Sequence, residues 1–309
     1  MDNITTLGQV SDRVNEMSKN CFDTNITVAD VSFDNLETVR IGNTQTHHLR
    51  EIAQRSISYR LGIPYQYLRK CPTEIQALNM NYWIEHEKND ELFFRYDGDD
   101  VRAIFTTKYR PVDNFEVLER LDSLGYGLDT RVQCKLDNEF MLLSIMDGNK
   151  AFHINGDKFK PGVSISNSEV GLASLGIAAF VLRLICSNGL VRKTEIGASY
   201  RHVSHKILSE FPRVLEDVSY ELGKQEHQLR ISMDSPVDNP QATINSFNRQ
   251  FQLKETERQA VEWAWPQEMG DTMFHIVNAY TRASQFPDLS AESSYQLQRV
   301  GGNILGMIN

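Results

Sequence analysis

The stretch that decides the fold spans residues 162–202 and reads GVSISNSEVGLASLGIAAFVLRLICSNGLVRKTEIGASYRH. It places small polar residues, which are typical of a binding or catalytic site, between apolar runs, which are typical of a hydrophobic core. We interpret residues 162–175 and 178–184 as extended, although the second run equally fits a buried helix, because a short apolar run has no decisive period. The 309 residues contain no phosphate-binding loop, metal-spaced Cys/His set or nucleophile elbow, so spacing alone identifies no reaction.

Strand patterns precede this stretch. Residues 91–97 and 101–109 flank an Asp-Gly-Asp turn signal, which predicts a hairpin. Residues 131–146 alternate around an Asp-Asn pair and predict a second hairpin, and residues 151–154 predict one more strand. Weak alternation in residues 25–35 indicates a short strand ahead of the first clear helix.

That helix is expected to begin with Thr44 or Thr46 as its N-cap and to end at Gly62, which an Ile-Pro pair follows. Its apolar face is formed at helical spacing by Leu49, Ile52, Ala53 and Ile57. Arg60 lies on the same face as Leu49 and Ala53. It therefore either satisfies the last carbonyls of the helix or reaches a ligand or a buried carboxylate.

Further helical patterns complete the fold. Residues 72–86, with Ile75, Leu78, Tyr82 and Trp83, and residues 115–124 each predict a helix, and five more are expected at residues 206–230, 242–251, 254–263, 271–283 and 290–301. The chain is therefore expected to have an α+β fold, mainly an antiparallel sheet with flanking helices, followed by a helical C-terminal part. We expect residues 1–204 to form the α+β body and residues 205–309 a helical region packed on it.

The composition limits the class of protein. With 40% hydrophobic and 24% charged residues, the chain resembles soluble globular proteins. No apolar run approaches the roughly 18 residues of a membrane span, and the N-terminus lacks a signal-peptide pattern. We therefore expect a cytoplasmic protein that does not bind membranes. Its four cysteines lie far apart without a CxxC pair, so we expect reduced thiols and no metal site.

The net charge of −9 opposes binding to a polyanion, so nucleic-acid binding requires local positive patches. Residues 40–70 hold six Lys or Arg against one Glu, a net of +5, and residues 183–206 hold five against one, a net of +4. Arg102, Lys108 and Arg110 form a cluster between them. For each cluster taken singly, a nucleic-acid site is no better an explanation than ordinary arginines that keep a helix face in contact with water and neutralise nearby carboxylates.

Tyrosines interleave with the cations in YRLGIPYQYLRK, residues 59–70. This composition suits stacking on bases while gripping phosphates, although aromatic residues beside a helix end are more often core residues. Under the nucleic-acid interpretation, phosphate contacts are expected from Arg50, Arg55, Arg60, Arg69, Lys70, Arg102, Lys108, Arg110, Arg192, Lys193, Arg201 and His202. The rings of three tyrosines are expected to stack on bases: Tyr65, Tyr67 and Tyr109.

A catalytic interpretation uses other residues. Asn167 and Glu169 share a strand face beside Gly171, where a ligand can approach the backbone, although a turn whose side chains bond their own backbone also explains them. His202 and His205 would share a helix face. Together these four side chains would serve a Mg²⁺-dependent nuclease or other phosphodiester enzyme. Under the nucleic-acid-binding interpretation we expect no cofactor.

Six blocks of the sequence carry a resemblance when they are taken in order. They are GIPYQYLRK (62–70), VRAIFTTKYRPVDN (101–114), SISNSEVG (164–171), RLICSNGL (183–190), RH (201–202) and VNAYTRA (277–283). Together they resemble a family of phage- and plasmid-borne proteins with a domain of unknown function, over about residues 45–285. The resemblance implies a mobile-element setting in a bacterial host cell and carries over no active site. Because such elements often encode proteins that handle single-stranded DNA, it favours nucleic acid as the partner.

We therefore expect a DNA-binding protein, leaning away from an enzyme, that binds single-stranded DNA or anneals strands in recombination or replication and works as a homo-oligomer. The metal-dependent phosphodiester enzyme is the first alternative. A protein-binding accessory that acts on a host system is the second.

Overall fold

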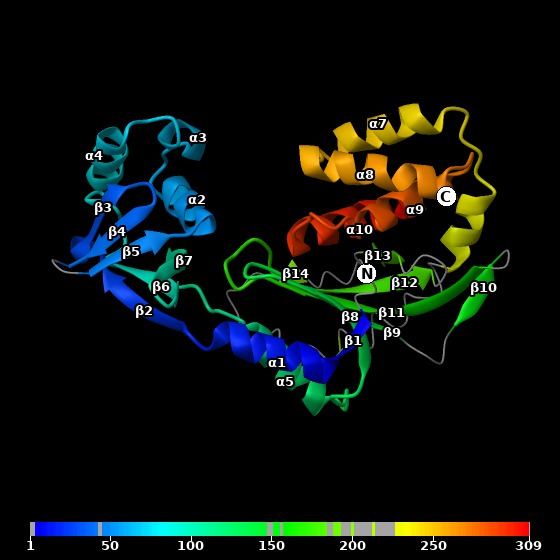
Figure 1. Cartoon of the computed structure of the whole chain (residues 1–309), viewed down its shortest axis with the longest axis horizontal. Helices are drawn as coiled ribbons and strands as arrows, with labels where there is room; N and C mark the ends of the chain where they lie inside the picture. The colour runs from blue at the N-terminus through cyan, green and yellow to red at the C-terminus, as the bar shows by residue number, and fades with distance from the viewer. Residues whose placement is uncertain are drawn as a thin grey trace. The chain divides into compact units, whose positions relative to one another are not determined.

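The computed structural model describes residues 4–42, 45–146, 151–154, 157–183, 188–192, 199–200, 212–213 and 226–308. The chain divides into two compact units. The small unit comprises residues 12–111, and the large unit comprises residues 1–11 together with 112–309. Helix α1 (Leu7–Ser18) spans the division. Figure 1 labels the elements of both units.

A six-stranded sheet forms the base of the small unit, in the order β2-β6-β7-β5-β4-β3. Its strands are β2 (Cys21–Thr27), β3 (Val31–Asn35), β4 (Thr38–Ile41), β5 (Gln45–Leu49), β6 (Glu91–Asp97) and β7 (Asp100–Thr106). Neighbouring strands are antiparallel, except that β5 and β7 are parallel. Its helices are α2 (Glu51–Arg60), α3 (Tyr65–Leu68) and α4 (Thr73–Ile84), and the 3-10 helix η1 (Val28–Asp30) joins β2 to β3.

The core of the small unit lies between this sheet and its helices. Leu92 and Phe94 of β6 are fully buried two residues apart on one face of the strand, in one cluster with Ala53 and Ile57 of α2 and Met80 of α4. Helix α2 packs against β7, and α4 packs against β3. The helices therefore cover the sheet face to which Leu92 and Phe94 point.

An antiparallel sheet forms the base of the large unit, in the order β1-β8-β9-β11-β12-β13, with β10 paired to β11 and β14 paired to β12. Its strands are β1 (Ile4–Thr6), β8 (Arg131–Leu136), β9 (Met141–Met146), β10 (Phe152–Ile154), β11 (Asp157–Asn167), β12 (Leu175–Arg183), β13 (Asn188–Arg192) and β14 (Ser199–Tyr200). Its helices include α5 (Asn114–Ser123), α7 (Pro240–Gln250), α8 (Glu255–Glu268), α9 (Met273–Ala283) and α10 (Ala291–Gly306).

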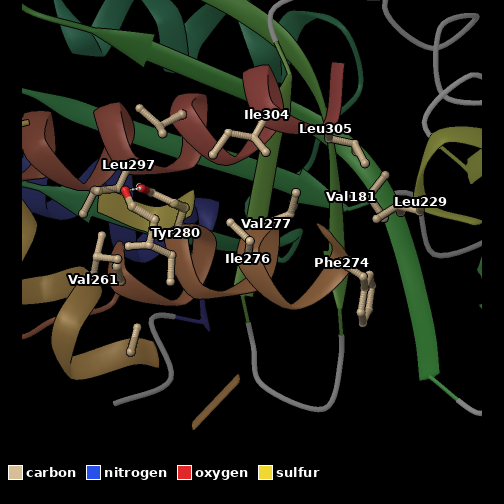
Figure 2. Packing of buried hydrophobic residues seen from close by; sticks show 14 of the residues in the cluster. Val181, Leu229, Val261, Phe274, Ile276, Val277, Tyr280, Leu297, Ile304 and Leu305 are labelled. Carbon is tan, nitrogen blue, oxygen red and sulfur yellow. Dashed lines mark hydrogen bonds between the residues drawn. The ribbon is translucent and has the colours of Figure 1, made fainter. Parts of the chain in front are cut away.

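The C-terminal helices form one apolar core with the end of the sheet. Helix α9 packs on α8 and α10, and both α9 and α10 contact β13. Figure 2 shows Phe274 and Tyr280 of α9 in this cluster with Leu297 of α10 and Val181 of β12. The buried carboxylate of Glu268 adds a polar tie, because it bonds Arg183 of β12 at 2.9 Å and lies 3.4 Å from Arg282 of α9.

Most of the expected fold is confirmed. The structure is α+β with antiparallel-rich sheets and a helical C-terminal part. Both expected hairpins exist, as β6–β7 and β8–β9. Residues 178–183 belong to strand β12, so the buried-helix alternative for this run is wrong. The expected boundary at residues 204 and 205 lies outside the described residues and stays a prediction, whereas the two compact units divide the chain elsewhere.

One helix prediction is corrected, and one helix was not predicted. The helix expected from Thr44 or Thr46 begins only at Glu51, because residues 45–49 pair with β4 as strand β5. Leu49 is buried in the same core as Ala53 from the end of this strand, so its helical spacing was fortuitous. Helix α1 was missed, although Leu7, Val10 and Val14, all buried, have the spacing that indicates it.

No helix among the described residues combines the length and the apolar character that crossing a membrane requires.

We predict that Tyr280→Phe lowers the free energy of unfolding by about 1–2 kcal/mol. The buried Tyr280 hydroxyl lies 3.0 Å from the Ile244 carbonyl oxygen and 2.7 Å from Asn248 Oδ1, and phenylalanine would remove the one hydrogen bond that its proton donates to this pair of oxygens. Urea denaturation measures the change. Tyr59→Phe is the control, because Tyr59 is 89% exposed. Equal stability of both variants and the parent chain would contradict this account of the helical core.

Candidate nucleic-acid interface

A surface built from α2 and α3 gathers cations and tyrosines in the small unit. We call it the α2–α3 surface and define it by Arg55, Tyr59, Tyr65, Tyr67, Arg69 and Lys70. Arg55 and Tyr59 are one helical turn apart on α2, so they share a face. Gly62 ends α2 with a φ of 70°, which a residue with a side chain rarely adopts, and Pro64 starts α3 two residues later.

The Tyr65 ring holds two guanidinium groups at the centre of this surface. The Cζ atoms of Arg55 and Arg69 lie 5.4 and 5.9 Å from the ring centroid. These distances fit cation–π contacts, which restrict two otherwise flexible side chains. Tyr65 is half-buried between α2 and α3, so it positions the arginines more than it offers a face to a base.

Glu51 forms an ion pair with Arg55 and a weaker electrostatic interaction with Arg69. Its carboxylate bonds Arg55 at 2.6 Å and accepts a hydrogen bond of 3.3 Å from the Tyr65 hydroxyl. The hydrogen bond from Arg55 holds the pKa of Glu51 below its usual value. Arg69 is exposed and has no ion pair with a carboxylate among the described residues. Its charge nevertheless acts on Glu51 from a distance and helps to lower the pKa of that carboxyl, so Arg69 is accessible to a ligand but partly offset.

The remaining members of the surface are open to solvent. Tyr59 is 89% exposed and Tyr67 is 49% exposed, and Lys70 follows them at the end of α3 as an exposed cation. An exposed ring of this kind has a face that a base can stack on. Tyr67, Arg69 and Lys70 are therefore accessible to a ligand, and the Tyr67 hydroxyl also hydrogen-bonds the side chains of Cys71 and Asn79.

Two expected phosphate contacts serve the fold instead. The Arg50 guanidinium bonds Asp97 at 2.6 Å and Asp100 at 3.0 Å, which ties the start of α2 to the β6–β7 turn. Arg60 lies 3.8 Å from Glu87, whose side chain is only 9% exposed. Of the roles expected for Arg60, the structure thus favours contact with a buried carboxylate. We leave both arginines out of the candidate interface.

The cluster in and after β7, which comprises Arg102, Lys108, Tyr109 and Arg110, is only partly accessible to a nucleic acid. Arg102 is 5% exposed, so it cannot reach a bound phosphate, and Tyr109 stacks on Phe105 with ring centroids 3.8 Å apart. Lys108 and Arg110 are exposed.

These two cations lie toward the same edge of the small unit as the end of α2. The Arg50 amide bonds Val101, and the Ser56 hydroxyl bonds Ile104, so α2 and β7 advance in the same direction. The C-terminal end of α2 and the residues after β7 therefore lie toward the same end of the small unit.

The cationic segment of residues 183–206 cannot be assigned to the α2–α3 surface. The backbone of Arg192 lies in β13, and Lys193, Arg201, His202 and His205 lie outside the described residues. Arg183, which opens the segment, bonds Glu268 in the large unit. The expected convergence of all three cationic segments therefore stays a prediction.

Asn167 and Glu169 fix the start of α5. The Asn167 amide donates to the Val112 carbonyl and to Asn114 Oδ1, both at 2.9 Å. Glu169 Oε1 accepts a hydrogen bond of 2.7 Å from the Asn114 amide in the first turn of the helix. Their bonds thus reach across 53 to 55 residues rather than to their own backbone. Among the described residues, no group of three or more His, Cys, Asp or Glu side chains is placed to hold a metal ion.

Sequence reasoning missed the outward-facing residues of α4. Ile75, Leu78, Tyr82 and Trp83 marked the helix in the sequence, yet they are exposed, and Met80 and Ile84 are the buried residues of its inner face. The sequence does not distinguish the two faces, because Met80 and Ile84 on one side and Ile75, Leu78 and Tyr82 on the other all have helical spacing.

Comparison with known proteins identifies one family. A family model described as a domain of unknown function, DUF932, matches residues 103–285. No curated protein and no solved structure is significantly similar to the chain. The matched segment covers most of the large unit and begins within β7, so the α2–α3 surface precedes it.

We predict that Glu169→Ala lowers the free energy of unfolding by about 1 kcal/mol, because the Asn114 amide loses its acceptor at the start of α5. Glu169→Gln keeps an acceptor oxygen and should retain most of the stability. Thermal and urea denaturation of the two variants measure the difference. Unchanged stability of the alanine variant would remove the structural role and return Glu169 to the list of catalytic candidates.

Proposed function

We propose that this chain, which belongs to the DUF932 family, binds nucleic acid, with single-stranded DNA as its ligand, through the α2–α3 surface that precedes the matched family segment. The observation that carries the proposal is the pair of guanidinium groups held on the Tyr65 ring, with Arg69 open to solvent. Lys70 lies beside Arg69 in the chain, and Lys108 and Arg110 are exposed cations toward the same end of the small unit.

Exposed tyrosine faces support single-stranded over double-stranded DNA. Tyr59 and Tyr67 present rings that unpaired bases can stack on, whereas the bases of a duplex already stack on one another. Each stacked base contributes on the order of 1–3 kcal/mol to binding. The two rings therefore supply affinity that does not depend on base sequence.

The negative net charge of the chain restricts nucleic-acid binding to the part of the surface that carries the α2–α3 cations. With a net charge of −9, most of the molecule repels phosphates, so a strand is attracted where Arg69 and Lys70 stand without carboxylate partners among the described residues. Displacement of counterions from the strand then makes affinity depend on salt. A short contact surface of this kind gives modest affinity for one copy of the chain.

The proposed setting is a phage or plasmid in the cytoplasm of a bacterial host, where the protein acts in recombination or replication. Several copies on one strand would raise the affinity beyond that of a single surface, which is why we propose a homo-oligomer. Annealing would follow if two coated strands met. The family description assigns no activity that would narrow this proposal further.

The metal-dependent alternative has less support. Asn167 and Glu169 already bond the start of α5, and the partners expected for them, His202 and His205, lie outside the described residues. Incubation of the full chain with DNA and Mg²⁺ or Mn²⁺ distinguishes the two functions, because a binding protein leaves the DNA intact.

We predict that the full chain binds a fluorescent single-stranded oligonucleotide at low salt and that Arg69→Ala/Lys70→Ala weakens binding by roughly tenfold. Removing two phosphate contacts should lower the slope of log affinity against log salt by about 1.4, because each contact to a single strand contributes about 0.7. Fluorescence anisotropy at several salt concentrations gives both quantities.

Arg230→Ala/Arg258→Ala is the matched control. It removes the same charge from exposed arginines of the large unit that are paired with Glu226 and Glu255. If both double variants lose affinity equally, only the net charge matters and the α2–α3 surface is not the site. Affinity of the parent chain weaker than micromolar at low salt would remove the function itself.

A further inference from the structure

Helix α4 exposes large apolar side chains on its outer face. We call Ile75, Leu78, Tyr82 and Trp83 the outer stripe, and they are 38%, 66%, 54% and 46% exposed. Their spacing of i, i+3, i+7 and i+8 puts them on one side of the helix. An apolar patch of this kind on a small protein unit more often marks an interaction site than a scatter of single exposed residues does.

The outer stripe cannot turn into the core, because the opposite face of α4 is fixed. Met80 and Ile84 are buried against the sheet. Asn81 bonds both backbone groups of Phe33, with its Oδ1 2.7 Å from the amide nitrogen and its Nδ2 2.9 Å from the carbonyl oxygen. Rotating α4 would break these bonds and expose the buried pair. The helix is therefore apolar on two opposite faces.

Aromatic contacts make one end of the stripe a preformed platform. The ring centroids of Tyr82 and Trp83 lie 5.2 Å apart in an edge-on arrangement, and that of His86 lies 4.7 Å from Tyr82. Rings that hold each other lose little conformational entropy when a partner binds. Leu78 and Ile75 continue the apolar surface toward the start of the helix.

Carboxylates border the stripe along one flank. Glu74 and Glu85 are exposed and have no ion pair among the described residues. They are 11 residues apart, which is about three turns or 16 Å, so they lie on nearly the same side of α4. A second copy of α4 packed antiparallel would bring the two acidic flanks together, and a nucleic acid would bring phosphates to them. Both occupants are disfavoured by like charge.

We propose that the outer stripe of α4 docks an amphipathic helix of a partner protein whose apolar side chains are bordered on one flank by lysine or arginine. Two packed helices bury such stripes by interdigitation of side chains. The basic flank of the partner pairs with Glu74 and Glu85 and sets its orientation. This protein-docking role goes beyond the proposed function and uses other residues than the α2–α3 surface, which it adjoins where Tyr67 hydrogen-bonds Asn79 of α4.

The test uses the full chain and two labelled synthetic peptides, each long enough to span α4. Both carry the same leucine stripe, and one has lysines along a flank where the other has glutamates. Fluorescence anisotropy should give at least about tenfold tighter binding of the lysine peptide. Glu74→Lys/Glu85→Lys should reverse this preference, and Leu78→Ser should weaken binding of the lysine peptide by roughly tenfold.

Leu128→Ser is the matched control, because Leu128 is a 62% exposed leucine in the large unit and its replacement should leave peptide binding unchanged. Circular dichroism confirms that each variant is folded. Equal binding of the two peptides, or a charge-reversed variant with unaltered preference, overturns the proposal. It is overturned equally if Leu78→Ser weakens single-stranded DNA binding as much as peptide binding, since the stripe would then belong to the nucleic-acid interface.

Discussion

Three amide side chains, Gln54, Gln76 and Asn81, determine where the helices of the small unit lie on their sheet. Gln54 is buried and donates to the Leu49 carbonyl, 2.7 Å away at the end of β5. Gln76 accepts from the Leu36 amide at 2.9 Å and donates to the Leu68 carbonyl at 3.0 Å, which links the β3–β4 turn to α3 and α4. Because each amide is largely removed from water, a lost partner would cost far more than the bond gains.

These amide contacts explain why the small unit presents two different surfaces. Anchored by Gln54, α2 turns Arg55 and Tyr59 outward, and the Tyr65 hydroxyl reaches within 3.4 Å of the same glutamine. The bonds of Asn81 to Phe33 direct the apolar stripe of α4 outward as well. The first surface combines cations with aromatic rings and suits a nucleic acid, whereas the second combines apolar residues with carboxylates and suits a basic protein segment.

Local patterns predicted the elements better than they predicted the site. Turn signals and alternation located β6–β7 and β8–β9, because both hairpins join neighbours in sequence. The roles of Arg50 and Arg60 were not predictable, since Asp97 and Glu87 lie 47 and 27 residues away in the chain and meet them only after folding. Spacing showed that α4 is a helix, but only tertiary contacts show that Met80, and not Leu78, lies inward.

Amide hydrogen–deuterium exchange of the full chain, with and without a thymidine oligonucleotide, tests the central claim most directly. The account predicts slower exchange in residues 51–70 when the strand is bound, because the amides of α2 and α3 lie beneath it. The exposed helix α8 of the large unit should exchange at an unchanged rate. Protection confined to the large unit, or none at an oligonucleotide concentration that saturates binding, would contradict the assignment of the interface to α2 and α3.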